Sequence, residues 1–220
     1  MIKTVIFDMD GVIVDTEPIH HYAFREHFNM LNIDVSAQMY ASFTGNSTKN
    51  VYQKLKENFN LKEDISELVN TKRNIFNDAF YKKEDLILLN GVEDLIKDLF
   101  SNNIQLILAS SSSKVTIEKV FTRFNLHQYF SHIVSGEDFP NSKPDPAIFE
   151  FASSLSIASK QNCIVIEDST NGIKAAKSAG IFCIGYDSSN SKLQDYSLAD
   201  IVINDFTEIN CQKIKSLKYE

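Results

Sequence analysis

Short apolar runs alternate with stretches of helical periodicity along most of the chain. Five runs have the length and composition of buried strands, and they cover residues 4–7, 105–109, 132–134, 163–166 and 182–184. Other apolar residues follow the i, i+3, i+4, i+7 spacing of amphipathic helices: Val92, Leu95, Ile96 and Leu99; Ile117, Val120, Phe121 and Phe124; Ile148, Phe151, Ala152 and Leu155. This alternation predicts an α/β fold with a Rossmann-like, doubly wound parallel sheet and helices on both faces.

The alternation stops between the first and second strand-like runs, where the chain shows helical patterns only. Three apolar stripes lie in this region: Phe24, His27, Phe28 and Leu31; Val51, Tyr52, Leu55 and Phe59; Ile65, Leu68, Val69, Lys72, Phe76, Ala79 and Phe80. Only Lys72 interrupts the third stripe. We therefore predict an α-helical cap domain over residues 16–84, inserted into an α/β core domain formed by residues 1–15 and 85–220.

Composition excludes several classes of protein. With 43% hydrophobic and 23% charged residues in 220, the chain reads as an ordinary globular protein. Its three cysteines form no CxxC pair, so neither a disulfide framework nor a zinc site is indicated. No apolar stretch has the length of a signal peptide core or a membrane span, and a net charge of -7 disfavours nucleic acid as a partner. We expect a cytoplasmic monomer or weak dimer without membrane contact.

Acidic and hydroxyl side chains follow the predicted strands at their carboxyl ends, where open α/β sheets bind ligands. These residues are Asp8 and Asp10 after the first run, Ser110–Ser113 after the second, Lys143 before the fourth, and Glu167 and Asp168 after the fourth. Three neighbouring carboxylates, Asp8, Asp10 and Asp168, would repel one another unless a cation neutralised them. Oxygen ligands suit a hard ion, so the pattern indicates Mg²⁺ with a phosphorylated substrate.

The segment after the second run has the features of a phosphate site. The hydroxyl groups of Ser110 and Ser111 lie where a helix should start, and main-chain N–H groups there bind anions. Lys143 would add a positive charge for the phosphoryl group, whereas Ser112 and Ser113 are expected to cap the helix. No strand is followed by G-x-G-x-x-G, so a dinucleotide-binding dehydrogenase is not indicated.

These residues closely resemble the motifs of the haloacid dehalogenase superfamily, in order and over nearly the whole chain. The resemblance implies that Asp8 is the nucleophile, which forms an aspartyl-phosphate, and that Asp10 is the general acid and base. It also implies that Mg²⁺ is held by Asp8, the main-chain carbonyl of Asp10 and Asp168, with Glu167 as a further candidate. A halide leaving group needs no proton, so Asp10 favours phosphate chemistry over dehalogenation.

The predicted cap resembles that of the β-phosphoglucomutase and phosphoglycolate phosphatase branch. Its candidate substrate contacts are Thr16, His20, Thr48, Lys49 and Arg73. His20 has the spacing of a mutase histidine, and Arg73 is near the place of a mutase phosphate-binding lysine. However, Thr48 stands where mutases have an arginine for a second phosphate, and Lys49 is one residue away. We therefore favour a Mg²⁺-dependent phosphatase of a small phosphorylated metabolite, a sugar phosphate. A sugar phosphomutase and a non-catalytic phosphate-binding regulatory protein remain as alternatives.

Overall fold

A six-stranded parallel sheet forms the centre of the core domain. The computed structural model describes residues 1–43, 46–187 and 194–217, and within them the strands pair in the order β3-β2-β1-β4-β5-β6. The strands are β1 (Thr4–Phe7), β2 (Gln105–Ser110), β3 (His132–Ser135), β4 (Cys163–Glu167), β5 (Phe182–Tyr186) and β6 (Ile201–Ile203). The five predicted strands are confirmed, and β6 is an addition. The strand order reverses between β1 and β4, which places the switch point of the sheet directly above Asp8.

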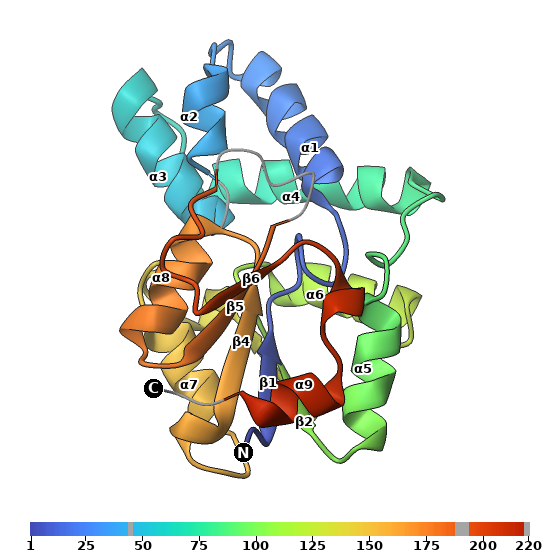
Figure 1. Ribbon diagram of the computed structural model, residues 1–220. Coiled ribbons are helices and arrows are strands. Elements are labelled where there is room, and N and C mark those ends of the chain that lie inside the picture. The colour runs from blue at the N-terminus through green and yellow to red at the C-terminus, as the bar shows by residue number, and fades with distance from the viewer. Residues whose placement is uncertain (44–45, 188–193, 218–220) are drawn as a thin grey trace.

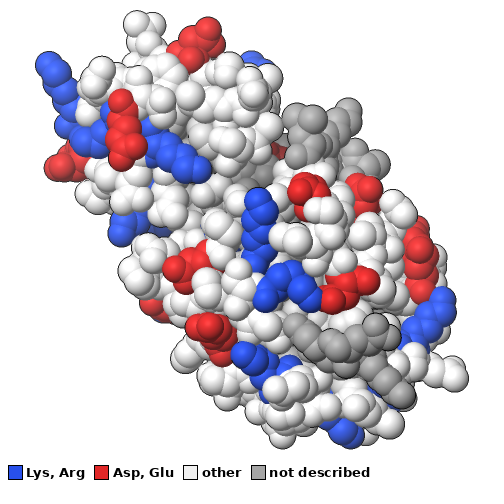
Figure 2. Space-filling model, turned by 60° about the vertical axis from the view of Figure 1, so that its left-hand side comes forward, with Lys and Arg blue, Asp and Glu red and all other residues white. Residues whose placement is uncertain are grey.

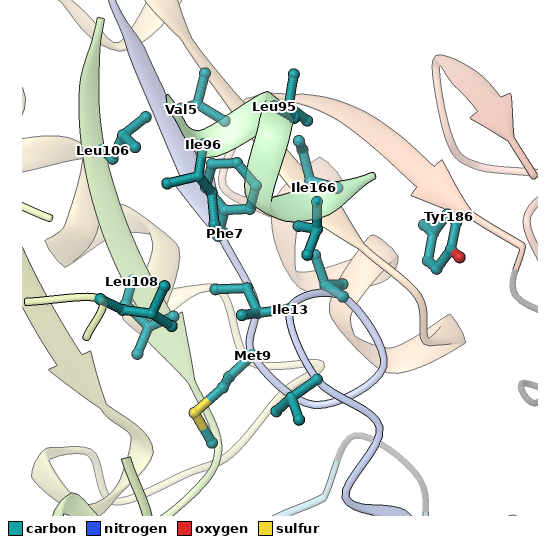
Figure 3. Packing of buried hydrophobic residues seen from close by; sticks show 14 of the residues in the cluster. Val5, Phe7, Met9, Ile13, Leu95, Ile96, Leu106, Leu108, Ile166 and Tyr186 are labelled. Atoms are coloured by element: carbon teal, nitrogen blue, oxygen red, sulfur yellow. The ribbon is translucent and has the colours of Figure 1, made fainter. Parts of the chain in front are cut away.

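Helices cover both faces of the sheet, because alternate residues of each strand point to opposite sides. Val5 and Phe7 face a cluster that includes residues of α5 (Val92–Ser101), α6 (Lys114–Arg123) and α9 (Cys211–Ser216). Figure 3 shows Phe7 packed beside Ile96 of α5. Ile6 faces the opposite layer of α7 (Ala147–Ser154) and α8 (Thr170–Ser178). Every residue of β1, β4 and β5 is buried, as expected for a parallel sheet covered on both sides. Short 3₁₀ helices η1 (Gly136–Asp138), η2 (Lys160–Asn162) and η3 (Phe206–Glu208) complete the core domain.

Helices α1 (Glu17–Met30), α2 (Ala37–Ala41), α3 (Thr48–Phe59) and α4 (Ile65–Lys82) lie between β1 and β2 in the chain. They stand beyond the carboxyl ends of the strands (Figure 1). Part of their apolar surface packs into a separate cluster, formed by Phe24, Phe28, Phe43, Val51, Tyr52, Leu55, Leu68 and Val69. Ile19 and Ala23 of α1 and Phe76 and Phe80 of α4 instead join the cluster of the core domain. The predicted fold class, an α/β core with inserted helices, is thus confirmed. We keep the name cap for residues 16–84.

One predicted apolar face is wrong in detail. The stripe on α7 was expected to include Phe151, but this side chain is 50% exposed, whereas Phe149 is fully buried. The buried residues of α7 are Ile148, Phe149, Ala152 and Ser153. Phe149 and Phe151 are separated by one residue, and each has the helical spacing to Ala152 or its neighbours, so packing against the sheet decides which of them faces inward.

Basic and acidic side chains are interspersed on the face of the molecule that Figure 2 shows. Among the helices within residues 1–43, 46–187 and 194–217, none combines the length and apolar character needed to span a membrane. Cytoplasmic location and a monomeric or weakly dimeric state stay predictions from the sequence.

Candidate active site

A buried lysine holds the carboxylate at the end of β1. Asp8 follows β1 directly, and its main-chain N–H donates to Ile166 O on β4 at 3.0 Å. Lys143 Nζ donates to Asp8 Oδ1 at 2.5 Å, to Ala109 O at 3.0 Å and to Glu167 Oε1 at 2.9 Å. These three acceptors fix the ammonium group of a residue that is only 2% exposed.

The protonation of this pair follows from its surroundings. Burial by itself lowers the pKa of Lys143, but the carboxylates of Asp8 and Glu167 outweigh that effect and raise the pKa above its ordinary value. Burial raises the pKa of Asp8 from 3.8 to about 7, against the attraction of Lys143. Lys143 therefore keeps its proton, and its attraction does not offset the effect of burial on the pKa of Asp8.

Asp10 is held by hydroxyl groups instead of a lysine. Thr16 Oγ1 donates to Asp10 Oδ1, and Ser112 Oγ donates to Asp10 Oδ2 at 2.6 Å. Ser113, in contrast, caps α6 by accepting from Thr116 N at 3.2 Å. The expected capping role is thus confirmed for Ser113 and wrong for Ser112. Burial raises the pKa of Asp10 to about 6, although the hydrogen bond from Ser112 opposes the rise.

Ser110 and Ser111 lie where the sequence predicted a phosphate site. Ser110 ends β2, is 1% exposed, and accepts from Ser112 N at 3.1 Å. Ser110, Ser111 and Lys143 all line the same cavity. Four consecutive serines look alike in the sequence, so the hydrogen bond from Ser112 to Asp10 could not be predicted from it.

The two acids after β4 have different surroundings. Glu167 Oε1 accepts from Lys143, and Oε2 accepts from Ser169 N at 2.7 Å and from Ser169 Oγ at 2.9 Å. Glu167 therefore orients Lys143 and the start of α8, and a Cβ atom on Gly172 would collide with its carboxylate. The Asp168 carboxylate lies against Gly11, where a Cβ atom would also collide. Gly11 has a φ of +80°, so glycine suits both its conformation and this close approach.

The residues present fit a hard divalent cation. Asp8 and Asp168 supply carboxylates, and Asp10 supplies a main-chain carbonyl, which are the oxygen ligands that Mg²⁺ takes together with water and phosphate oxygens. Within the described parts of the chain, no three His, Cys, Asp or Glu side chains converge into a metal centre by themselves. The ligand set implied by the resemblance needs only two carboxylates.

A cavity of about 300 Å³ lies between the site and the cap. From the cap it is lined by Glu17, His20, Phe24, Tyr40, Thr48, Lys72, Arg73 and other residues, and from the core by Asp8, Asp10, Ser110, Lys143 and Asp168 among others. Its volume suits a small metabolite. His20, Thr48 and Arg73, three of the predicted substrate contacts, line this cavity, and their contact with substrate stays a prediction.

Two predicted substrate contacts lie elsewhere. Thr16 is fully buried and outside the described lining of the cavity, and its hydroxyl group holds Asp10. Lys49 is exposed and also outside that lining, because α3 begins at Thr48 and turns the next side chain outward. We correct both expectations. Gly45, which shortly precedes Thr48 and Lys49 in the sequence, lies outside the described residues.

Lys72 is a functional candidate that sequence reasoning missed. It is 1% exposed, and its Nζ lies 4.4 Å from the centre of the Phe24 ring and 2.5 Å from His20 Nδ1. Burial lowers the pKa of Lys72 from 10.5 to about 7, although Glu17 and Asp10 oppose the fall. The signal that could have found it was the interruption of an apolar stripe by one charged residue.

Glu17 is a second residue that the sequence did not mark. It is half-buried at the start of α1, and Tyr40 Oη donates to its Oε1 at 2.9 Å. Burial raises the pKa of Glu17 to about 7, although the hydrogen bond from Tyr40 opposes the rise. The cap side of the cavity therefore carries both a basic and an acidic group.

Comparison with known proteins supports the family that the motifs suggested. A family model described as haloacid dehalogenase-like hydrolase matches residues 5–186. The chain is 30% identical over 180 residues to a phosphorylated carbohydrates phosphatase of Thermotoga maritima, which covers 81% of this chain and 82% of that protein. It is also 30% identical over 215 residues to a β-phosphoglucomutase of Bacillus subtilis, covering 96% and 92%. A crystal structure of β-phosphoglucomutase from Clostridium difficile aligns with a TM-score of 0.85 at 29% identity, covering 98% of this chain and 96% of that one.

The fold and these matches together define the class of protein. It is an enzyme related to phosphatases and phosphomutases, with a parallel sheet and a helical cap. The chain belongs to the haloacid dehalogenase-like hydrolase family, in the branch that contains β-phosphoglucomutases.

Proposed function

We propose that this enzyme is a Mg²⁺-dependent phosphatase that hydrolyses a small phosphorylated metabolite, a sugar phosphate. The observation that carries the proposal is the different environment of two carboxylates only two residues apart. Asp8 is held by the ammonium group of Lys143, and Asp10 by the hydroxyl groups of Thr16 and Ser112. One carboxylate is thus suited to attack phosphorus and the other to exchange a proton.

The reaction follows in two steps. An Asp8 oxygen forms a bond to phosphorus while the bond from phosphorus to the sugar oxygen breaks, and Asp10 gives its proton to that oxygen. Asp10 then takes a proton from water, whose oxygen attacks phosphorus and releases Asp8 and inorganic phosphate. Lys143 keeps Asp8 oriented throughout because Ala109 and Glu167 fix its ammonium group.

Mg²⁺ and the phosphoryl group would share the carboxyl edge of the sheet. Asp8, Asp168 and the carbonyl of Asp10 would hold the ion, which when bound neutralises charge on the phosphoryl oxygens. Ser110, Ser111 and Lys143 would receive those oxygens. On the core side of the described cavity lining, Lys143 is the buried cation. The ion would add the further positive charge that the carboxylates and the phosphoryl group need at this edge.

The cap side supports a polar substrate of sugar size. His20, Thr48 and Lys72 offer hydrogen-bonding groups to the same cavity of about 300 Å³, while Phe24 and Phe76 give it an apolar wall. The name of the Thermotoga maritima relative refers to phosphorylated carbohydrates. A sugar phosphate is the substrate class that agrees with both observations.

A panel of phosphomonoesters with Mg²⁺, read by release of inorganic phosphate, tests the proposal. We expect hydrolysis of one or more sugar phosphates. Phosphate binding without turnover of any ester would favour the non-catalytic alternative.

The position of His20 favours one other candidate, a sugar phosphomutase, because its Nε2 lies 4.0 Å from Asp10 Oδ2. β-Glucose 1-phosphate in the panel separates the two. Free phosphate is the expected product, whereas glucose 6-phosphate would identify a mutase.

A further inference from the structure

One ion pair joins the cap to the core at the rim of the cavity. Arg73 on α4 places Nη2 2.6 Å from Oε1 of Glu137 on η1, and each side chain is about a third exposed, at 32% and 31%. Arg73 also lines the cavity. The pair therefore connects the two domains at a point that both solvent and substrate approach.

The core end of this pair is tied to the loop that forms the site. Glu137 Oε2 accepts from Lys114 N at 2.9 Å, at the start of α6. Ser135 Oγ, two residues earlier, donates to Ser112 O at 2.8 Å, and Ser112 itself holds Asp10. Since the other Glu137 oxygen faces Arg73, a closed cap is linked to the loop that positions the acid.

A different arrangement fixes the hinge side of the cap. Arg123 near the end of α6 donates to Lys83 O at 2.8 Å and to Glu84 O at 2.9 Å, where the chain leaves the cap. Main-chain acceptors therefore anchor this segment to α6. The pair of Arg73 and Glu137 can instead separate without breaking any main-chain contact.

We propose that Arg73 and Glu137 form a cap clasp, which holds the cap closed over the bound substrate. In this role Arg73 is a positioning residue: its guanidinium group pairs with Glu137 and does not bind a phosphate group of the substrate. A partly exposed ion pair contributes little stability. The pair can therefore break at each turnover, when the cap opens and the product leaves.

The structure offers a matched set of variants. Glu137→Gln removes the charge that faces Arg73 and keeps an oxygen for Lys114 N, and Arg73→Met keeps the length of the side chain. Asp138→Asn is the control, because Asp138 is the next residue of η1 and pairs with Lys114 Nζ at 2.6 Å, within the core. It removes the same charge from the same short helix without touching the cap.

Steady-state kinetics on a hydrolysed sugar phosphate give the first readout, which rests on the proposed function. Each clasp variant should raise KM about two- to fivefold without lowering kcat, the effect expected of one partly exposed pair. The double variant should match either single variant, and Asp138→Asn should match the wild type. Arg73 as a substrate contact predicts otherwise: Arg73→Met would lose affinity equally in the wild-type and Glu137→Gln backgrounds, while Glu137→Gln would resemble Asp138→Asn.

Small-angle X-ray scattering of the substrate-free protein gives a second readout that needs no turnover. Both clasp variants should show a larger radius of gyration than the wild type and Asp138→Asn, because more molecules have an open cap. An unchanged radius in both variants would overturn the clasp. Absence of phosphatase activity with the expected change in scattering would count against the proposed function alone.

Discussion

Lys72 Nζ on α4 lies 2.5 Å from His20 Nδ1 on α1. A protonated Lys72 can only donate to Nδ1, and the proton of the neutral imidazole is then on Nε2, which lies 4.0 Å from Asp10 Oδ2. Burial and the charge of Lys72 lower the pKa of His20 well below 6.5 and keep it neutral. The His20 ring also stacks on Phe76, with centroids 4.3 Å apart. Its orientation is therefore fixed before substrate binds.

Replacing Lys72 by an apolar residue should raise the stability of the protein and lower its activity. Lys72→Met keeps the side-chain volume and removes a charge that burial makes costly, so at pH 7 and below the free energy of unfolding should rise by about 1–4 kcal/mol. The same variant should lose about tenfold or more in kcat/KM, since the cavity loses its buried cap cation. Urea unfolding and phosphate release measure the two effects.

The stability change caused by Lys72→Met should depend on pH in a defined direction. The folded pKa of Lys72 is about 7 and the ordinary value is 10.5, so between these values the unfolded chain binds the additional proton and wild-type stability rises with pH. The stabilisation by Lys72→Met should therefore shrink as pH rises toward 10.5. Glu17, His20, Asp10 and Arg73 are the charged or titratable groups nearby. Lys49→Met, on the exposed cap surface, should leave stability unchanged; equal effects of the two variants would contradict the account.

The core half of the site could be predicted from the sequence because strand ends are visible in it. Apolar runs locate β1, β2 and β4, and parallel strands bring their carboxyl ends to one edge, so Asp8, Ser110 and Asp168 had to be neighbours. The contact of Lys143 with Asp8 spans 135 residues. The sequence predicted the charge of Lys143 at this edge of the sheet, and the resemblance to a family supported that prediction.

The cap half could not be predicted in the same way. Glu17, Tyr40 and Lys72 belong to three helices, and their meeting depends on helix packing that periodicity does not specify. Lys72 interrupts an apolar stripe, but the interruption does not show which residues of the other helices lie near its ammonium group. The strand β6, Ile201–Ile203, was missed although its apolar run is as long as the predicted runs at 132–134 and 182–184; its middle residue, Val202, is 43% exposed.

Asp10→Asn tests the role of the proton donor. The variant should slow hydrolysis of a sugar phosphate about a hundredfold or more, the usual contribution of general acid catalysis. Formation of nitrophenolate from a nitrophenyl phosphate should slow much less in a single turnover, because that leaving group needs little protonation. Rapid-mixing measurements on both esters check this. Equal losses would show that Asp10 does not protonate the leaving oxygen.

Binding of Mg²⁺ can be measured without turnover. An ion that binds only the folded protein stabilises it by mass action, by about 2.7 kcal/mol when the ion concentration is a hundred times Kd. The midpoint of thermal unfolding rises as a result. We expect this rise in the wild type, its reversal by EDTA, and its loss in Asp168→Asn. Asp138→Asn is the control and should keep the rise. A midpoint indifferent to Mg²⁺ in the wild type would contradict the assigned ligands.

The claim that Asp8 attacks phosphorus is tested most directly by mass spectrometry of enzyme quenched in acid during turnover. The account predicts one added phosphoryl group on the peptide that contains Asp8, and a loss of about a thousandfold or more in phosphate release for Asp8→Asn. Circular dichroism should show an intact fold in that variant, because Lys143 keeps its contact with Glu167. Undiminished phosphate release by Asp8→Asn, with no phosphorylated peptide from the wild type, would contradict it.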